Sequence, residues 1–431
     1  MKKLLILGGK PIGSTEIVQA ARKKGIYTVV ADYLPESESP AKIIADEQWN
    51  ISVDRIDELA KKIKAEHIDG VVAGVHEFCL RKAIQVCEKC GLPSWCTLAQ
   101  WDNCSNKKAF KDLCVKNGID VAKTYKLEDE IDFPVIVKPA DSDGSRGFSI
   151  CHNRDELEKG VQHALEFSTD YLIEEFIQSD ACIIHYTVVN GEVIFSGISD
   201  KHSRRLEGGS MVMALQTFPA IDQERYLKEV NDKAIQMFKS IGIKNSPIWI
   251  EAFNDGKRFV FNEMALRFGG SMTNYPVMYN TGIDQLELFI DAALGKTTQM
   301  KSNREIKQEE NYAILPIHLK EGKILRIKGA EELLADSKMK QMVLVHHVGD
   351  EIKNWGTAQQ VFCYLHMTYR DGNEFAENIK KVKDTLSVEN ENGCNMLYFL
   401  NASSTTESAK FISKHFALIK SRSDRILIGM E

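Results

Sequence analysis

Two glutamates stand in neighbouring apolar segments that a tight turn joins. Residues 248–253 and 259–266 both alternate as β-strands do, and Asp255-Gly256 between them favours a hairpin. The hairpin would place Glu251 and Glu263 side by side on one face of an apolar sheet. Two carboxylates this close repel each other unless a cation lies between them, and hard oxygen ligands of this kind suit magnesium. The alternative is that both glutamates are solvated strand residues.

Two lysines and a glycine-rich loop could hold an anion. Lys138 ends the apolar run 133–137, just before the loop 141–147. An ammonium at the end of a buried strand needs an anion, and the backbone N–H groups of such a loop form a cradle for phosphate oxygens. Lys107, in the first turn of an upstream helix, would contact the same anion. Either lysine alone is more often an exposed surface residue. The loop residues that would supply N–H groups are Gly144, Ser145, Arg146 and Gly147.

A cation and an acid mark the ends of two further strands. Arg267 lies four residues beyond Glu263, where the hairpin ends, so it could hold a developing anion near the metal. The run 71–75 predicts a buried parallel strand, which places His76 and Glu77 at its carboxyl end. Open α/β sheets bind ligands at that edge. The alternative is that His76 and Glu77 only cap the helix that follows.

The N-terminal residues alternate strand-like and helix-like runs, which predicts a parallel sheet with crossover helices. The turn after the first strand resembles a P-loop, but Ser14 stands where the phosphate-binding lysine belongs. It also resembles a dinucleotide fingerprint, because Asp32 lies 19 residues after Gly13, although Gly8-Gly9 replaces the usual G-x-G. The turn is either a strand-to-helix turn that needs small residues or the ligand-facing edge of a larger site. The runs are residues 4–7, 16–24, 27–31, 56–66, 70–75 and 80–90.

The remaining chain divides into a helix, a small lid and β-rich segments. A helix capped by Ser105 or Asn106 runs to about residue 117, and residues 124–177 have the strand, loop and helix order of a small α+β lid. Asn190-Gly191 favours a hairpin between two strands. Beyond residue 322 we expect a mostly β region. Its strands are residues 323–327, 342–347 and 361–368, and its helix is residues 374–386.

Composition excludes several classes of protein. With 431 residues, 43% hydrophobic and 27% charged, the chain is an ordinary globular protein of about three domains. Its 55 basic and 61 acidic residues give a net charge of -6, so we expect no nucleic acid and no membrane as partner. The first residues lack the apolar stretch of a signal peptide, which favours a cytoplasmic protein. We expect the ten cysteines to be thiols, with Cys87 and Cys90 packed as small apolar groups rather than bound to zinc.

Taken together, these motifs resemble the ATP-grasp family, strongly over about residues 1–330 and weakly beyond. In order, that family has a lysine opening the interdomain helix, a lysine in a P-V-x-V-K-P strand, a flexible glycine loop, an E-x-x-[VIL] hinge and paired acidic strands. The members that the chain resembles are L-amino-acid ligases, biotin carboxylase and carbamoyl-phosphate-synthase large-chain-like proteins. The matching positions are Lys107, Lys138, residues 143–147, Glu174-Glu175-Phe176-Ile177, Glu251 and Glu263.

The resemblance implies an α/β ATP-grasp fold in three domains. Residues 1–97 would form an N-terminal Rossmann-like (pre-ATP-grasp) domain. Residues 98–330 would form the ATP-grasp domain with a small α+β lid at about 124–177, and residues 331–431 a C-terminal, mostly β region of α+β type. The implied cofactors are ATP and magnesium, with manganese as an alternative.

The resemblance also assigns residues to ATP and the metal. Two departures bear on this: Ala181 stands where the family's ribose acid often lies, and Glu263-Met264-Ala265 lacks the amide of the usual E-x-N metal motif. The second departure is closer to the ATPase subunits of purine-biosynthesis carboxylases. The implied set is Glu174 and the backbone of Glu175 and Ile177 at the adenine amino edge, Asp180 at the ribose, Phe253 on the adenine face, and Glu251 with Glu263 on magnesium.

The activity that the resemblance implies is ATP- and magnesium-dependent ligation. A carboxylate becomes an acyl phosphate, which an amine or similar nucleophile attacks. Lys138 and Arg267 would be catalytic, holding phosphates and the acyl phosphate. Glu77 would receive an ammonium or hydroxyl of the substrate, while Arg267 and Gly269-Gly270 receive its carboxylate, which suits an amino acid better than bicarbonate.

Three alternatives stay open. They are a bicarbonate-activating carboxylase or carbamoyl-phosphate-synthase-like enzyme, a nucleotide-binding regulator without turnover, and a Rossmann dehydrogenase built on the turn 8–13 and Asp32. The presence of Glu263 and Arg267 favours catalysis over a regulator. The expected partners are small molecules, a carboxylate and an amine or other nucleophile, and a homodimer is an open alternative to a monomer.

Overall fold

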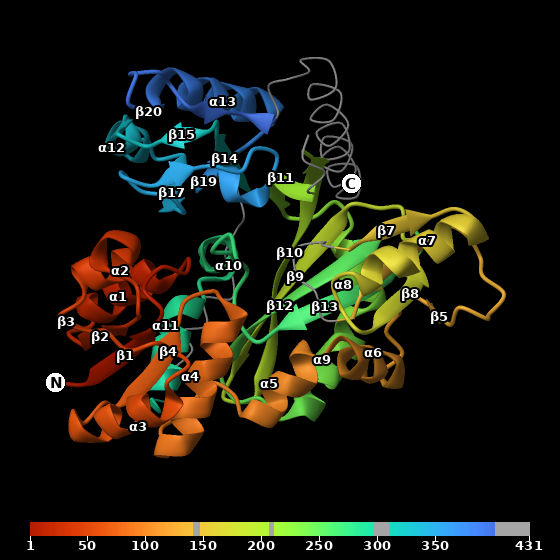
Figure 1. Ribbon diagram of the computed structural model, residues 1–431, viewed down its shortest axis with the longest axis horizontal. Helices are drawn as coiled ribbons and strands as arrows, with labels where there is room; N and C mark the ends of the chain where they lie inside the picture. Colours follow the sequence, from red (N-terminus) through yellow and green to blue (C-terminus); the bar gives the residue numbers. More distant parts are fainter. Residues whose placement is uncertain (141–146, 207–210, 297–309, 401–431) are drawn as a thin grey trace, which may run out of the picture.

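The N-terminal unit is a parallel sheet with helices packed against it (Figure 1). The computed structural model describes residues 1–140, 147–206, 211–296 and 310–400. The strand order β3-β2-β1-β4 confirms the predicted alternation of strands and helices. The short α2 and β3 were not predicted, because so few residues show no periodicity. The elements are β1 (Lys3–Leu7), α1 (Ser14–Lys23), β2 (Tyr27–Ala31), α2 (Pro40–Ile44), β3 (Glu47–Trp49), α3 (Ile56–Ala65), β4 (Gly70–Ala73) and α4 (Glu77–Cys90).

The turn after β1 is filled by the protein's own groups. The Asp32 carboxylate accepts hydrogen bonds from the backbone N–H groups of Gly9 at 2.8 Å and Leu34 at 2.9 Å. The Ser39 hydroxyl donates a third at 3.2 Å. A Cβ atom on Gly9 would lie 2.1 Å from Ser39 Oγ, so no side chain fits there. The carboxylate that a dinucleotide ribose would need is already satisfied, which favours a strand-to-helix turn over a dehydrogenase site.

The helix that leads to the lid carries two lysines. Asn106 begins α6 (Lys107–Lys116), because its side chain accepts a hydrogen bond from the Ala109 N–H group at 2.9 Å. This contact confirms one of the two predicted caps. Lys107 and Lys111 are four residues apart on α6, so their side chains share one face of the helix.

The lid is a small antiparallel sheet with one helix, coloured yellow and orange in Figure 1. Its strands pair in the order β5-β8-β6-β7. Leu157 and Val161 of α7 belong to the same buried apolar cluster as Val135 and Val137 of β6. The predicted α+β lid is therefore confirmed. Its elements are β5 (Thr124–Tyr125), β6 (Val135–Pro139), β7 (Ser149–Cys151), α7 (Arg154–Leu165) and β8 (Tyr171–Glu175).

One long antiparallel sheet runs through the rest of the described chain, in the order β13-β12-β9-β10-β11-β14-β19-β17, with β21 beside β14. The β9–β10 and β12–β13 hairpins were both predicted. The strand β14 was not predicted, and it continues the sheet into the C-terminal unit because it pairs with β11 and β19. The residue limits of the three domains stay predictions. The strands are β9 (Ala181–Val189), β10 (Glu192–Arg205), β11 (Met211–Phe218), β12 (Ser246–Asn254), β13 (Phe259–Ala265), β14 (Asn311–Leu319), β17 (Met339–Leu344), β19 (Val361–Tyr369) and β21 (Leu397–Tyr398).

Further helices and short strands complete these units, and the C-terminal one is mostly β with α13 on it, blue in Figure 1. Within the described ranges, no helix has both the length and the apolar character that crossing a membrane requires. The remaining elements are η1 (Glu36–Glu38), α5 (Leu98–Ser105), α8 (Gln223–Glu229), α9 (Asn231–Ile241), α10 (Asn274–Thr281), α11 (Gln285–Ala293), β15 (Gly322–Lys323), β16 (Arg326–Lys328), α12 (Ala330–Leu334), β18 (Glu351–Ile352), η2 (Ala358–Gln360), α13 (Gly372–Thr385) and β20 (Ser387–Glu389).

A buried histidine makes the stability of this fold depend on pH. His185 on β9 is 1% exposed and stacks on Phe218, and neither ring nitrogen has a hydrogen-bond partner among the described residues. Burial lowers the pKa of His185 to about 3. The unfolded chain therefore takes up a proton that the folded chain excludes. The resulting stability is fully present above the unfolded pKa of about 6.5 and is lost as the pH falls towards 3.

We expect His185→Phe to remove part of this pH dependence. Between pH 7 and pH 5 the wild-type free energy of unfolding should fall by about 2 kcal/mol more than that of the variant. Urea denaturation at both pH values measures the difference. His152→Phe, at an exposed position, should behave like the wild type. Equal losses in wild type and His185→Phe would contradict the assignment.

Candidate active site

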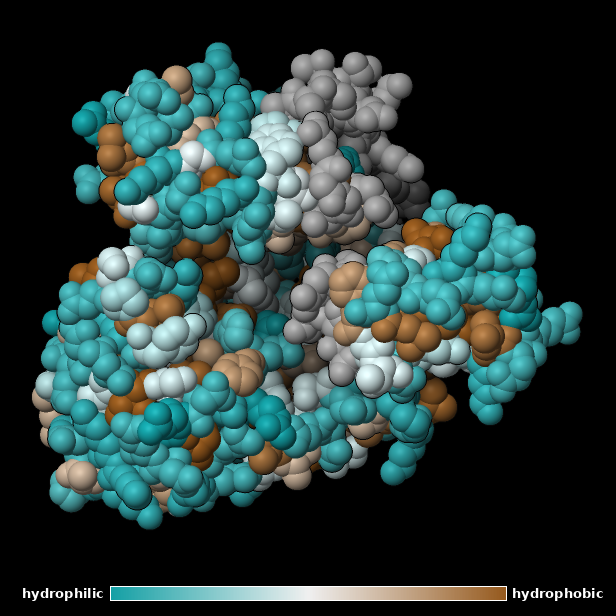
Figure 2. All heavy atoms as spheres, in the orientation of Figure 1, coloured by the Kyte–Doolittle hydropathy of each residue, from teal (hydrophilic) through white to brown (hydrophobic). Residues whose placement is uncertain are grey.

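The predicted site residues come from the N-terminal unit, the lid and the central sheet, and the charges of Glu251, Lys107 and Glu77 all act on Glu263. Figure 2 shows this face of the molecule hollowed between the N-terminal unit and the lid. Strands β12 and β13 supply acids, while α6, β6 and β10 supply lysines. The start of α4 and the residues after β13 supply a glutamate and an arginine. The charged side chains form three clusters.

The first cluster is the acid pair. Glu251 and Glu263 lie directly opposite each other on β12 and β13, as predicted. The next paired residues are Ala252 and Phe261, so Asn262 is an extra residue that bulges from β13. The Asn262 amide donates a hydrogen bond to Glu251 Oε1 at 3.2 Å. Burial, and then repulsion by Glu251, raise the pKa of Glu263, so a cation between the two carboxylates would stabilise both.

Two lysines bring positive charge to the acid pair. Lys201 on β10 donates to Glu251 Oε2 at 2.6 Å, and the two side chains are 29% and 14% exposed. Burial alone would lower the pKa of Lys201, but attraction to Glu251, Glu263 and Asp180 together outweighs burial and raises it. Lys107 is close enough for its charge to favour the ionised form of Glu263. The acid pair is therefore partly neutralised by the protein itself.

The second cluster is a buried carboxylate held by two lysines. Glu174 on β8 is 2% exposed and accepts hydrogen bonds from Lys138 Nζ at 2.6 Å and from Lys111 Nζ. Burial by itself would raise the pKa of Glu174, but attraction to Lys138 and Lys111 outweighs it and keeps that pKa below its usual value. Two ammonium groups against one carboxylate leave a net positive charge that suits phosphate. The contact of Glu174 with adenine stays a prediction.

The residues that follow Glu174 lie at the end of β8. The Glu175 N–H group donates to the Lys123 carbonyl at 2.8 Å, and the Glu175 carboxylate pairs with Arg258 from the β12–β13 turn. Ile177 is buried, at 9% exposure. The backbone contacts of Glu175 and Ile177 with adenine therefore also stay predictions.

Two further predicted nucleotide contacts lie on the central sheet. Phe253 is half-buried on β12, two residues from Glu251 and so on the same face of the strand. Asp180 is exposed just before β9, and its Oδ1 accepts a hydrogen bond from the Ser203 N–H group at 3.4 Å. Their roles toward the adenine face and the ribose remain predictions.

The third cluster joins residues that are 190 positions apart. Arg267 Nη2 donates to Glu77 Oε1 at 2.9 Å, and the guanidinium lies 5.2 Å from the centre of the Trp249 ring. Arg267 Nε is buried and has no hydrogen-bond partner among the residues that the structure describes. His76 makes no side-chain capping bond to α4, which disfavours the capping alternative for that residue. The structure thus pairs the two groups that were predicted to hold opposite ends of a substrate.

Three of the glycines predicted to contact ligands can be described. The Gly269 N–H group donates to the Thr273 hydroxyl at 2.7 Å, while Gly270 borders open space. Gly147 has a φ of 72°, and a Cβ atom there would lie 2.7 Å from Pro139, so this position requires glycine. The predicted phosphate-loop residues that lie outside the described ranges are Gly144, Ser145 and Arg146.

Sequence reasoning missed three side chains of this site. Lys111 lies one helical turn after Lys107, and that spacing could have indicated it. Lys201 and Asn262 carry no such signal, because one lies on a strand two positions away in the sheet and the other depends on a β-bulge.

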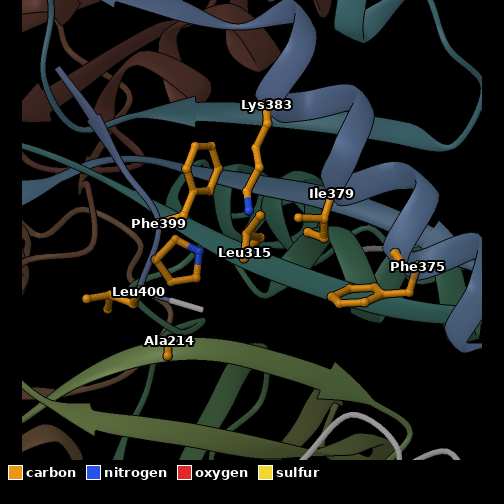
Figure 3. A pocket seen from close by; sticks show the side chains of 9 residues that line it. Ala214, Leu315, Phe375, Ile379, Lys383, Phe399 and Leu400 are labelled. Atoms are coloured by element: carbon orange, nitrogen blue, oxygen red, sulfur yellow. The ribbon is translucent and has the colours of Figure 1, made fainter. Parts of the chain in front are cut away.

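A separate cavity of about 150 Å³ lies in the C-terminal unit (Figure 3). Phe375, Ile379 and Lys383 extend from α13 toward Leu315 of β14. The lining contains one charged side chain, that of Lys383, and none of the predicted site residues. This cavity therefore lacks the acid pair on which the proposed chemistry depends.

The donor set of the acid pair fits magnesium. Glu251 and Glu263 offer carboxylate oxygens from adjacent strands, and the described residues form no group of three or more His, Cys, Asp or Glu side chains suited to a metal. Magnesium often combines one or two carboxylates with phosphate oxygens and water. Glu251 and Glu263 would hold the ion, and Lys107 and Lys138 the phosphates.

Residues 105–301 match the family model described as "Carbamoyl-phosphate synthase L chain, ATP binding domain". The matched range contains the acid pair, Lys201, the Glu174 cluster and Arg267. Glu77 lies outside it, in the N-terminal unit.

Known proteins resemble parts of the chain of different length. A formate-dependent phosphoribosylglycinamide formyltransferase of Bacteroides fragilis is 27% identical over 314 residues, 68% of this chain and 78% of that protein. A D-alanine–D-alanine ligase of Fusobacterium nucleatum is 29% identical over 146 residues, 32% of this chain and 48% of that protein.

Solved structures resemble the fold over most of the chain. The L-amino acid ligase of Bacillus licheniformis aligns with a TM-score of 0.72 and 19% identity, covering 91% of this chain and 99% of that one. A biotin carboxylase domain of the 2-oxoglutarate carboxylase of Hydrogenobacter thermophilus, in complex with MgADP and bicarbonate, aligns with a TM-score of 0.73 and 19% identity. That alignment covers 90% of each chain.

Proposed function

We propose, from the premise that this chain belongs to the ATP-grasp superfamily of ADP-forming ligases, that it activates the carboxylate of an amino acid for attack by an amine. The observation that carries the proposal is the pairing of Arg267 with Glu77 beside the acid pair. A cation and an anion together match the carboxylate and the ammonium of an amino acid, whereas bicarbonate has no ammonium for Glu77 to receive.

The first chemical step places the substrate carboxylate against the terminal phosphate of ATP. Arg267 exchanges its bond to Glu77 for the substrate carboxylate, and its buried Nε supplies a further donor. Lys138 and Lys107 hold phosphate oxygens. Magnesium, held by Glu251 and Glu263, would neutralise charge on the transferred phosphoryl group. A carboxylate oxygen attacks that group, the bond to ADP breaks, and an acyl phosphate forms.

The second step joins the acyl group to the amine. The amine nitrogen attacks the acyl carbon, phosphate leaves, and the nitrogen loses a proton to the departing phosphate or to water. Arg267 can stabilise the oxyanion that develops on the carbonyl oxygen of the acyl group, because its guanidinium is fixed by Trp249 and by the Phe268 carbonyl. Glu77, which is 54% exposed, is free to receive the ammonium of the substrate once Arg267 has turned to the carboxylate.

The test is ADP release from magnesium and ATP across a panel of carboxylates. The panel contains amino acids singly and in pairs, dicarboxylates, bicarbonate, and also formate, because a 27% identical relative is named for formate. We expect release that depends on an amino acid, with a new amide detected by mass spectrometry. ADP release with formate or bicarbonate alone would identify that compound, and not an amino acid, as the substrate. The absence of any substrate-dependent ADP release would contradict catalysis.

We expect Glu77→Ala to raise the Michaelis constant for the amino acid by about tenfold and to change that for ATP by less than about twofold. The reason is that Glu77 is paired with Arg267, whereas Lys138, the predicted phosphate ligand, is paired with Glu174. Steady-state kinetics with each substrate varied in turn measure both constants. Glu58→Ala, on the exposed side of the same unit, is the matched control. A change confined to the Michaelis constant for ATP would place Glu77 in the nucleotide site instead.

A further inference from the structure

We infer that Lys201 is the counter-ion of the metal site. Lys201 pairs with Glu251 before the nucleotide arrives, and it moves to a phosphate oxygen when magnesium and ATP bind. This inference rests on the proposed function and adds a residue to it. Lys201 thus has two successive partners, a carboxylate in the free protein and a phosphate in the complex.

The present partner of Lys201 is a residue that the metal needs. Lys201 Nζ lies 2.6 Å from Glu251 Oε2, and Asn262 Nδ2 lies 3.2 Å from Glu251 Oε1. Both oxygens of Glu251 are therefore engaged by donors. A divalent cation that binds between Glu251 and Glu263 can use the remaining lone pairs of these oxygens, but it repels the Lys201 ammonium and so weakens the contact of Lys201 with Glu251.

The sheet places Lys201 in the same cross-strand row as the predicted base site, two strands away from it. Lys201 lies opposite Ala181 of β9, and Ala181 in turn lies opposite Phe253 of β12. Glu251 is two residues from Phe253, on the same face of β12. A nucleotide whose adenine meets Phe253 and whose phosphates reach the acid pair would therefore lie beside the Lys201 ammonium, which is in contact with Glu251.

Burial keeps Lys201 at the site once Glu251 is released. The Lys201 side chain is only 29% exposed, so its ammonium cannot simply turn into bulk water without rearrangement of its surroundings. A half-buried ammonium requires an anion. The phosphates brought by magnesium-bound ATP supply that anion at the moment when magnesium takes Glu251, so the exchange leaves no charge uncompensated.

The experiment uses Lys201→Met, which keeps the length of the side chain and removes its charge. Manganese is titrated into the full-length protein without nucleotide, and free manganese is followed by electron paramagnetic resonance. We expect manganese to bind about tenfold more tightly to Lys201→Met than to the wild type, because the competing cation is gone. The Michaelis constant for ATP should rise about tenfold in the same variant, because a phosphate contact is lost.

Two control variants accompany Lys201→Met. Lys201→Arg keeps the charge, so its manganese affinity should stay near that of the wild type. Lys257→Met removes an exposed lysine from the β12–β13 turn and should change neither constant. A loss of folding in Lys201→Met would lower manganese binding in parallel with the thermal midpoint, and Lys201→Gln then repeats the titration.

Unchanged or weaker manganese binding in folded Lys201→Met would overturn the inference. Tighter manganese binding with an unchanged Michaelis constant for ATP would overturn the proposed transfer of Lys201 to a phosphate. The proposed function fails separately: it requires amino-acid-dependent ADP release by the wild type, whereas the manganese titration needs no turnover at all.

Discussion

Glu263→Gln should abolish substrate-dependent ADP release, by about a thousandfold or more, while the protein stays folded. Glu263 faces Glu251 across the β12–β13 hairpin, and the two carboxylates are the oxygen donors that fit magnesium. Glutamine keeps the size of the side chain but removes the negative charge that would hold the ion. The measurement is ADP release at saturating ATP and magnesium, with the thermal midpoint recorded in parallel.

The thermal midpoint separates a metal role from a structural one. Burial and repulsion by Glu251 raise the pKa of Glu263, so its charge destabilises the metal-free fold. Glu263→Gln should therefore keep or slightly raise the midpoint without metal, and it should lose any stabilisation that magnesium with ATP gives the wild type. Glu229→Gln, at an exposed position on α8, is the matched control. Full ADP release by Glu263→Gln would remove Glu263 from the metal site.

Lys138→Met should lower kcat/KM for ATP by about a hundredfold or more. Lys138 Nζ lies 2.6 Å from the buried Glu174 carboxylate, at the end of the strand that precedes the glycine-rich loop. The same carboxylate keeps Lys111 as a partner, so the variant does not leave a buried charge unpaired. The loss should therefore fall on ATP rather than on folding.

The matched control is Lys108→Met, because Lys108 lies on α6 with an 85% exposed side chain. It should leave kcat/KM for ATP unchanged. Lys111→Met would show whether the second lysine binds phosphate or only holds Glu174 in place. Loss of a phosphate ligand should lower kcat/KM for ATP, whereas loss of a positioning residue should mainly lower the thermal midpoint. If Lys138→Met used ATP as well as Lys108→Met does, the phosphate role of Lys138 would be wrong.

Local patterns were enough to predict the hairpin that carries the acid pair, but not the register that makes the pair. The β-bulge at Asn262 sets Glu251 opposite Glu263 rather than opposite Asn262, whereas the alternation of apolar residues and the Asp255-Gly256 turn act within about twenty residues and specify the hairpin itself. The same holds for Asn106, whose side chain satisfies an N–H group three residues away. The order of the lysines, the hinge and the acids likewise needs no tertiary contact, which is why the fold class followed from the sequence.

The sequence by itself determined the alternating N-terminal unit, the lid, the two hairpins and the motifs that they carry, because hydrophobic periods, turns and caps are interactions between near neighbours in the chain. Only the tertiary structure decided which charges meet. Lys201 and Glu251 are 50 positions apart, Lys111 and Glu174 are 63 apart, and Arg267 and Glu77 are 190 apart. A lysine on a strand or helix has no local feature that distinguishes a solvated side chain from a buried ion pair. Its partner is fixed by the order of strands in the sheet and by the packing of the lid and the N-terminal unit against it, since Coulomb attraction between side chains depends on distance in space and on burial, not on separation along the chain.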